Sequence, residues 1–244
     1  MSAPDAPVRI GCAGWRLSSR VAAAFPETGS HLERYAAVLS AVEINSAFYR
    51  PHRPETYARW RDSVPDAFRF AVKMPRAISH EQRLRNAEAP LERFLAEAGQ
   101  LQHKLGCLLL QLPPSLAFIR GEAEAFFALL RQRTDVAVAC EPRHASWFSP
   151  EAAEMMRRYR FSCVDADPAP VEAAEPAGFA ALAYLRLHGS PTMYRSSYTP
   201  AFLEAVAAYI EALTAAGRQV WCVFDNTTES HAIPNALWLT RLLR

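Results

Sequence analysis

The 244-residue chain carries 27 basic and 25 acidic residues, half of its residues are hydrophobic, and its formal net charge is +2. This composition can bury a large core, which excludes a disordered chain, a collagen-like repeat and a disulfide mini-protein. The charge balance also excludes a global field that would bind polyanions non-specifically.

Eight short runs of apolar or β-branched residues predict strands in chain order. They lie at residues 8–14, 41–48, 69–75, 105–113, 136–143, 161–167, 181–189 and 219–226. Helical patterns lie between them at residues 32–40, 54–64, 90–104, 122–133, 150–160, 200–216 and 234–243. Only the connection between the sixth and seventh strands lacks a clear helix.

Strands that alternate with helices are joined by right-handed crossovers and form a parallel sheet. Eight such units in a chain close to the typical length of about 250 residues predict a TIM (β/α)8 barrel of the α/β class, with an irregular sixth βα unit. No change in composition marks a domain boundary, so residues 1–244 are expected to form a single domain.

The start of the chain and its cysteines bear on location. The first ten residues lack the basic start and long apolar stretch of a secretion signal, and no run reaches the roughly 20 apolar residues of a membrane-spanning helix. The five cysteines are an odd number without CxxC spacing, which argues against a disulfide framework and a structural zinc site. We therefore expect a cytoplasmic protein without a membrane partner.

Polar residues occur late in several predicted strands, on one face of each. Alternate residues of a barrel strand face the interior, which places Glu43, Lys73 and Glu141 inside, and Arg186 and His188 share one face of the seventh strand. The carboxyl ends of all barrel strands meet at the rim where characterised barrel enzymes carry out their chemistry. We therefore expect these side chains to converge there.

Side chains of mixed charge at short range shift one another's pKa values and can supply a general acid, a general base and electrostatic stabilisation. Glu43 and Glu141 are the candidate acid and base, His188 a proton shuttle, and Asp165 or Asp225 orienting partners. The structural alternative is a polar layer whose ion pairs only satisfy one another. The candidate catalytic residues are Glu43, Lys73, Glu141, Asp165, His188 and Asp225.

Further residues in or just beyond the predicted strand ends are candidates to contact a substrate. Lys73, Arg143 and Arg186 are expected to hold an anionic group, because cations at a desolvated rim bind oxyanions strongly. Aromatic residues there either wall a pocket or pack at the rim. The candidate substrate-binding residues are Trp15, Asn45, Tyr49, His80, Arg143, His144, Trp147, Arg186, Tyr194, Tyr198 and Asn226.

Cofactor motifs are not found. Neither GxGxxG nor GxxxxGK[ST] occurs, so no nucleotide cofactor is predicted and the cofactor is unknown. His144 and His188 could bind a divalent metal together with nearby carboxylates. No local spacing of ligands supports this, so no metal ligand is assigned.

Several groups of residues, in order along nearly the whole chain, are similar to those of one family. They are Gly11 to Trp15, Glu43 to Arg50, Phe70 to Lys73, Ile78 to His80, Gln111 to Ser115, Glu141 to Trp147, Arg186 to Gly189 with Tyr194 and Tyr198, and Phe224 to Thr227. The chain resembles the YecE-like family, also called domain of unknown function 72. The resemblance implies a TIM barrel in a family whose activity is not established. Ala13 and Ala47 stand where the family often has Ser and Thr, which bears on shared hydroxyl contacts.

These features favour an enzyme that acts by general acid/base chemistry at the C-terminal rim of the barrel. Its expected substrate is small, polar and anionic: a carbohydrate, a sugar phosphate or a related phosphoester. Hydrolase, isomerase and lyase chemistry are all feasible with such groups. The alternatives are a nucleic-acid-binding or endonuclease-like barrel, which needs a basic, aromatic-lined groove and several metal ligands, and a non-catalytic ligand-binding barrel. The oligomeric state does not follow from the sequence.

Overall fold

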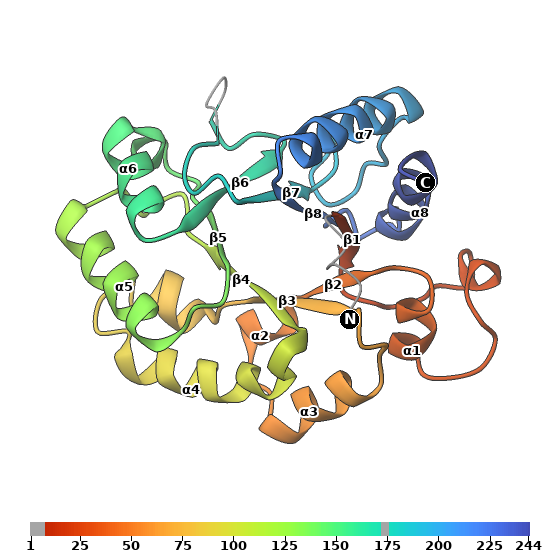
Figure 1. Cartoon of the computed structure of the whole chain (residues 1–244), viewed down its shortest axis with the longest axis horizontal. Helices are drawn as coiled ribbons and strands as arrows, with labels where there is room; N and C mark the ends of the chain where they lie inside the picture. Colours follow the sequence, from red (N-terminus) through yellow and green to blue (C-terminus); the bar gives the residue numbers. More distant parts are fainter. Residues whose placement is uncertain (1–7, 172–175) are drawn as a thin grey trace.

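Eight parallel strands close into a barrel in the computed structural model, which describes residues 8–171 and 176–244 (Figure 1). The strands pair in sequence order, and the first pairs with the eighth to complete the ring. They are β1 (Val8–Ala13), β2 (Ala41–Ile44), β3 (Arg69–Lys73), β4 (Leu105–Gln111), β5 (Val138–Glu141), β6 (Phe161–Asp167), β7 (Leu182–Leu187) and β8 (Gln219–Phe224). The predicted barrel is confirmed.

Helices surround the barrel (Figure 1). They are α1 (His31–Ala36), α2 (Ser46–Tyr49), α3 (Pro54–Asp62), α4 (Glu88–Ala98), α5 (Arg120–Arg133), α6 (Pro150–Arg158), α7 (Pro200–Ala215) and α8 (Ala232–Leu242). Four shorter helical turns are η1 (Ala22–Ala24), η2 (Ala77–Glu81), η3 (Gly99–Lys104) and η4 (Ala145–Phe148). In the described part of the chain, no helix is long and apolar enough to cross a membrane.

Local sequence explains where α6 and α7 begin. The side-chain oxygens of Ser149 and Thr199 each accept a hydrogen bond from the backbone N–H three residues later. A proline follows each cap, where its missing N–H is tolerated because the first turn has no partner for it. Gly217 follows α7 with a φ of +75°, a conformation that glycine adopts without strain.

The ends of some predicted elements differ from the structure. The strand predicted at 41–48 ends at Ile44, because Asn45 takes helical backbone angles and starts α2. The helix predicted at 90–104 ends at Ala98 and is followed by η3, in which Gln102 has a φ of 52°. The connection after β6, expected to be irregular, has no helix in its described part, and residues 172–175 lie outside the described residues. Residues 1–7, on which the prediction about a secretion signal largely depends, lie outside them too.

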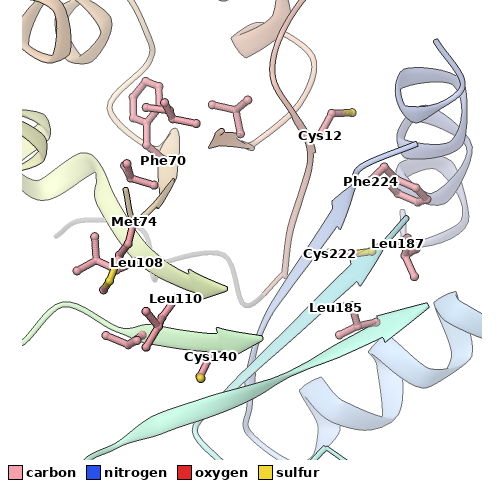
Figure 2. Close-up of a cluster of buried hydrophobic side chains, with 14 of the residues drawn as sticks. Cys12, Phe70, Met74, Leu108, Leu110, Cys140, Leu185, Leu187, Cys222 and Phe224 are labelled. Atoms are coloured by element: carbon pink, nitrogen blue, oxygen red, sulfur yellow. The ribbon is translucent and has the colours of Figure 1, made fainter. Parts of the chain in front are cut away.

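Two apolar layers pack on the two sides of the sheet. The larger one lies between the strands and the helices, and Figure 2 shows strand side chains of this layer. The smaller one fills the barrel interior, where the rings of Tyr184 and Trp221 stack with centroids 5.9 Å apart. Gly106 is required beside them, since a Cβ there would lie 2.6 Å from the Trp221 ring. Small interior residues make room for the rings: Ala41, Ala71, Cys107 and Ala139.

Candidate active site

Charged side chains from five strands converge at the carboxyl end of the barrel. Three are carboxylates and four are basic, and all but Arg143 are at most 7% exposed. The alternation of residues along the strands explains why they share the interior. They are Glu43 on β2, Lys73 on β3, Glu141 and Arg143 at the end of β5, Arg186 and His188 at the end of β7, and Asp225 after β8. We call these seven residues the rim cluster.

Arg186 contacts all three carboxylates of the rim cluster. Its Nη2 atom lies 2.7 Å from Glu43 Oε1 and 2.9 Å from Asp225 Oδ2, and its Nη1 donates to Glu141 Oε2 at 3.0 Å. Burial alone would lower the pKa of this guanidinium, but the carboxylates raise it well above its ordinary value. Arg186 is therefore a permanent cation that holds the three anions together.

Glu43 is fully buried, and both of its oxygens are occupied. Tyr184 Oη donates to Oε2 at 2.7 Å, and Arg186 Nε lies 3.2 Å from each oxygen. Its two oxygens are thus engaged by protein donors rather than open to a ligand. Its geometry is that of a group that orients Arg186.

His188 bridges the other two carboxylates. Its Nδ1 lies 3.1 Å from Asp225 Oδ2 and its Nε2 lies 3.1 Å from Glu141 Oε1. Burial lowers the pKa of the imidazole, but the hydrogen bonds to Asp225 and Glu141 outweigh it and raise the pKa above its ordinary value of 6.5. The contacts favour the charged imidazolium, which donates from both nitrogens.

Glu141 and Asp225 are held in their ionised form. Burial would raise the pKa of each carboxyl, but Arg186 and His188 hold both values below their ordinary range. Glu141 also accepts a hydrogen bond from Arg143 Nη2 at 2.8 Å. Neither carboxyl therefore carries a proton that it could donate near neutral pH.

Lys73 differs from the other members of the rim cluster because its ammonium has no ion-pair partner among the described residues. Its Nζ lies 4.2 Å from the centroid of the Phe48 ring, and it makes no hydrogen bond or ion pair with any described residue. Burial and then the charge of Arg186 lower its pKa from 10.5 to about 8, although Glu43, Glu141 and Asp225 oppose the change. Its ammonium therefore loses its proton more readily than that of an ordinary lysine.

Two cavities open at the same end of the barrel. The larger, about 730 Å³, is lined by the loop after β1, by Thr227 and Thr228 and by the start of α8; the smaller, about 470 Å³, is lined by Trp15, His31 and Asn45. The rim cluster does not line either cavity directly. Asn45 connects it to the smaller cavity, because its Nδ2 lies 3.5 Å from Asp225 Oδ1.

Some buried polar atoms near the rim cluster have no hydrogen-bond partner among the described residues. They include Asn45 Oδ1, Arg143 Nε and Asn226 Oδ1, and Ser18 Oγ at the larger cavity. Buried polar atoms are nearly always paired in folded proteins. These atoms are therefore places where a ligand would gain hydrogen bonds.

The expectation that Asp165 joins this cluster is wrong. Its neighbours Val164 and Ala166 fill the barrel interior, so Asp165 points to the helical side of β6. There burial raises the pKa of its carboxyl, which is opposed by a hydrogen bond from Tyr209 of α7. Residue alternation along the strand is the physical reason for this placement.

The expected position of Trp147 at the rim is also wrong. It is 2% exposed and packs in the helical shell, with its Nε1 donating to the Leu116 carbonyl at 2.9 Å. Tyr198 and Asn226 hold the loop after β7: Tyr198 Oη accepts from Gly189 N, and Asn226 Nδ2 donates to the Ser196 carbonyl.

Four other expected ligand contacts lie at the edge of the site. The rings of Tyr49 and His80 pack edge-on against the Phe48 ring, with centroids 5.0 and 4.9 Å from its centroid. The centroid of the Tyr194 ring lies 5.5 Å from that of the His188 ring. Trp15 lines both cavities. His144 instead bonds to Ser146 Oγ at 2.8 Å and caps η4.

Two residues of the site are absent from the candidate catalytic and substrate-binding residues. Tyr184, which donates to Glu43, shares the inward face of β7 with Arg186, so the alternation along that strand was a signal for it. Phe48, which covers the Lys73 ammonium, was predicted as the end of a strand and lies on α2.

The acidic side chains of the rim cluster are paired with cationic side chains. Within residues 8–171 and 176–244, no three His, Cys, Asp or Glu side chains are placed to hold a metal ion. The carboxylates of the rim cluster are instead paired with Arg186, Arg143 and His188. A cation at this position would have to displace these groups.

Comparison with known proteins identifies relatives along most of the chain. The family described as "Protein of unknown function DUF72" matches residues 9–244. The UPF0759 protein YecE of Escherichia coli K12 is 32% identical over 151 residues, which are 59% of this chain and 55% of YecE. The UPF0759 protein YunF of Bacillus subtilis 168 is 26% identical over 151 residues, which are 59% of this chain and 53% of YunF. The chain thus matches about half the length of these relatives.

Solved structures share the fold. A DUF72 family protein from Enterococcus faecalis V583 superposes with a TM-score of 0.79 at 23% identity, covering 97% of this chain and 95% of the other. A DUF72 family protein from Thermotoga maritima MSB8 gives 0.78 at 23% identity, covering 97% and 98%. At this level of identity the likeness concerns the barrel alone.

Proposed function

The chain belongs to the DUF72 family of proteins of unknown function, and we propose that it is an enzyme that binds a small polar anion at the carboxyl end of the barrel and acts on it by proton transfer. The observation that carries this proposal is the ammonium of Lys73 in the rim cluster, which makes no hydrogen bond or ion pair with any described residue. An unpaired buried cation gains most from an anionic ligand, because such charge-assisted hydrogen bonds are strong in a desolvated site.

The charge balance of the rim cluster supports an anionic substrate. Arg186 is already paired with all three carboxylates of the rim cluster. Lys73 and Arg143 Nε then remain available on the cationic side, and the contacts of His188 favour its charged form. With His188 protonated, four cations face three carboxylates, so the site carries one excess positive charge.

The same contacts separate the catalytic roles. Glu43 and Glu141, expected as the acid and the base, accept hydrogen bonds from Arg186 and its neighbours and are assigned to positioning. Lys73, with a pKa of about 8, is the group suited to gain and lose a proton. His188, whose pKa is raised by the hydrogen bonds to Asp225 and Glu141, complements it as an electrostatic partner when protonated.

The cavities fit a carbohydrate, a sugar phosphate or a related phosphoester. Pockets for small ligands typically measure about 300–1,000 Å³, and the two cavities at this end measure about 730 and 470 Å³. Their linings carry hydroxyl, amide and basic side chains beside Trp15, a mixture suited to a polyol with an anionic group.

Thermal-shift and calorimetric titrations test this proposal. Inorganic phosphate, ribose 5-phosphate and ribose are titrated into the wild-type protein, Arg143→Gln and, as a control, Arg157→Gln on the exposed surface of α6. We expect the two phosphates to stabilise the wild type and the control, and Arg143→Gln to weaken binding at least about 10-fold, as the loss of a hydrogen bond to a charged group predicts. Equal binding of ribose, or an unchanged affinity in Arg143→Gln, would contradict it.

The nucleic-acid alternative makes a different prediction for the same protein. Binding through phosphate contacts weakens steeply with salt, so a gel-shift assay at low salt separates it from a small-molecule site. Passive ligand binding predicts instead that Lys73→Arg binds the phosphates as the wild type does and that no compound is turned over by either protein.

A further inference from the structure

Lysine is rare in this chain. Of the 27 basic residues besides histidine, 25 are arginine and only Lys73 and Lys104 are lysine. Both are buried, each 7% exposed. Neither lysine therefore serves as an exposed surface cation, a position that arginines occupy in this chain.

The two lysines have different surroundings. Lys104 Nζ donates to the carbonyls of Arg61 and Val64 at 2.8 and 2.7 Å, which ties η3 to the end of α3 and to the segment after it. Lys73 Nζ has no such acceptor among the described residues and faces only the ring of Phe48 at 4.2 Å. Lys104 thus has a structural role that accounts for its amine, whereas the contacts of Lys73 do not.

Arginine would supply the same positive charge as Lys73, but it cannot lose its proton in a protein. A lysine amine becomes a nucleophile when burial or a neighbouring cation favours its neutral form. Lys73 has both features, since it is buried in the barrel interior and Arg186 contributes to its lowered pKa of about 8. Compared with an ordinary lysine, this raises the neutral fraction at pH 7 roughly 300-fold.

We propose that Lys73 forms an imine with the carbonyl carbon of the substrate, so that the substrate is an aldehyde or ketone that carries an anionic group, such as an open-chain sugar phosphate or a 2-oxo acid. This inference rests on the proposed function and names its substrate class. Lys73 then acts as a nucleophile in addition to its part in proton transfer.

The step balances without a further reactant. The neutral amine adds to the carbonyl carbon, forming a C–N bond while the C=O π electrons pass to oxygen. Loss of that oxygen as water leaves a protonated C=N bond. The overall change is therefore ammonium plus carbonyl to iminium plus water. Both hydrogens of the water come from the ammonium nitrogen by proton transfer. Glu43, Glu141 and Asp225, whose charges act on Lys73, stabilise the cationic product.

Reductive trapping tests the inference. The full-length protein is incubated with glycolaldehyde, dihydroxyacetone phosphate or pyruvate in the presence of cyanoborohydride, and the modified peptides are quantified by mass spectrometry. Lys104 and the N-terminal amine are internal controls in the same sample, and Lys73→Arg is the variant that keeps the charge but cannot form an imine. Inorganic phosphate is added as a competitor.

We expect label on Lys73 at least about 10-fold above that on Lys104, its absence in Lys73→Arg, and its reduction by phosphate. Preferential labelling by dihydroxyacetone phosphate identifies a phosphorylated substrate, and preferential labelling by pyruvate a carboxylated one. Label confined to the N-terminal amine or Lys104 with all three probes overturns the inference. If phosphate then still binds and Arg143→Gln weakens it, the proposed function stands without the imine; if phosphate does not bind, both fail.

Discussion

Arg186 and Glu43 are 143 residues apart in sequence, yet they form a 2.7 Å ion pair across the inside of the barrel, with side chains 1% and 0% exposed. Such a pair must be desolvated on folding, and the cost is recovered only because every donor and acceptor is matched. Arg186 also holds Glu141 and Asp225. The stability of the barrel rim therefore depends on one guanidinium.

Arg186→Met should strongly destabilise the protein, because it leaves three buried carboxylates without their common partner. Removing one side of a buried ion pair typically costs about 3–5 kcal/mol, and we expect at least this loss in the free energy of unfolding measured with urea. Arg157→Met, which removes an exposed pair with Glu154, should cost less than about 1 kcal/mol. Similar losses in the two variants would show that the rim cluster is solvated.

Lys73→Met should have the opposite effect and stabilise the protein at pH 7. A pKa of about 8 in place of 10.5 means that the folded state disfavours the ammonium by roughly 3 kcal/mol, an upper limit for the gain. Functional groups often reduce stability in this way. Lys104→Met is the matched control and should destabilise, since it removes two hydrogen bonds to carbonyls.

The difference in the free energy of unfolding between the wild type and Lys73→Met should also depend on pH, which is a separate test of Lys73. The pKa of Lys73 is lower in the folded state than in the unfolded one. The destabilisation caused by its buried ammonium is therefore fully present below about pH 8 and disappears as the pH rises towards 10.5. The groups whose charges act on the amine are Arg186, Glu43, Glu141 and Asp225. Urea denaturation of the wild type and Lys73→Met at pH 7, 8.5 and 10 should show the gap between them closing; a constant gap would exclude a titrating Lys73.

Residue alternation was sufficient to predict much of this site. In β2, β3, β5 and β7 a polar face alternates with an apolar one, so the inward positions of Glu43, Lys73, Glu141 and Arg186 followed from the sequence. The number of βα units likewise predicted the closed barrel. Each of these inferences used a local sequence pattern that recurs from one βα unit of the barrel to the next.

Alternation failed where a strand lacks such a contrast. In β6 each face carries both polar and apolar residues, Ser162 on one and Asp165 on the other, so the sequence does not indicate which face is inside. The rim position of Trp147 was likewise undetermined, because a residue beyond a strand end turns inward or into the shell according to the loop that follows. There η4 directs the Trp147 ring to Phe118 and Phe127.

The placement of Asp165 outside the barrel has a functional consequence. Asp165→Asn should leave the binding of inorganic phosphate within about twofold of the wild type, whereas Asp225→Asn, which removes an ion-pair partner of Arg186 and His188, should change it by about 10-fold or more. Both variants replace a carboxylate by an amide of the same shape. Calorimetric titration distinguishes them, and a large effect of Asp165→Asn would place this residue in the site after all.

His188 provides a last test, because its charge depends on the two carboxylates beside it. Its folded pKa is raised, so its contribution to stability is present below about pH 6.5 and is lost as the pH rises through the folded value. Glu141 and Asp225 have lowered pKa values, so their contributions are present above their ordinary values of 4.5 and 3.8 and are lost as the pH falls through the folded ones. Together these groups should stabilise the protein most between about pH 4.5 and 6.5.

Glu141→Gln removes one of the two acceptors of His188 and should lower the pKa of the imidazole, as NMR titration of the histidine ring would measure. Glu154→Gln, an exposed carboxylate on α6, is the control and should leave it unchanged. The same substitution should flatten the loss of stability above pH 6.5, since less of the imidazolium's stabilisation is then available to lose. A His188 that titrates at or below 6.5 in the wild type would mean that burial outweighs both carboxylates and that the site carries no excess positive charge near neutral pH.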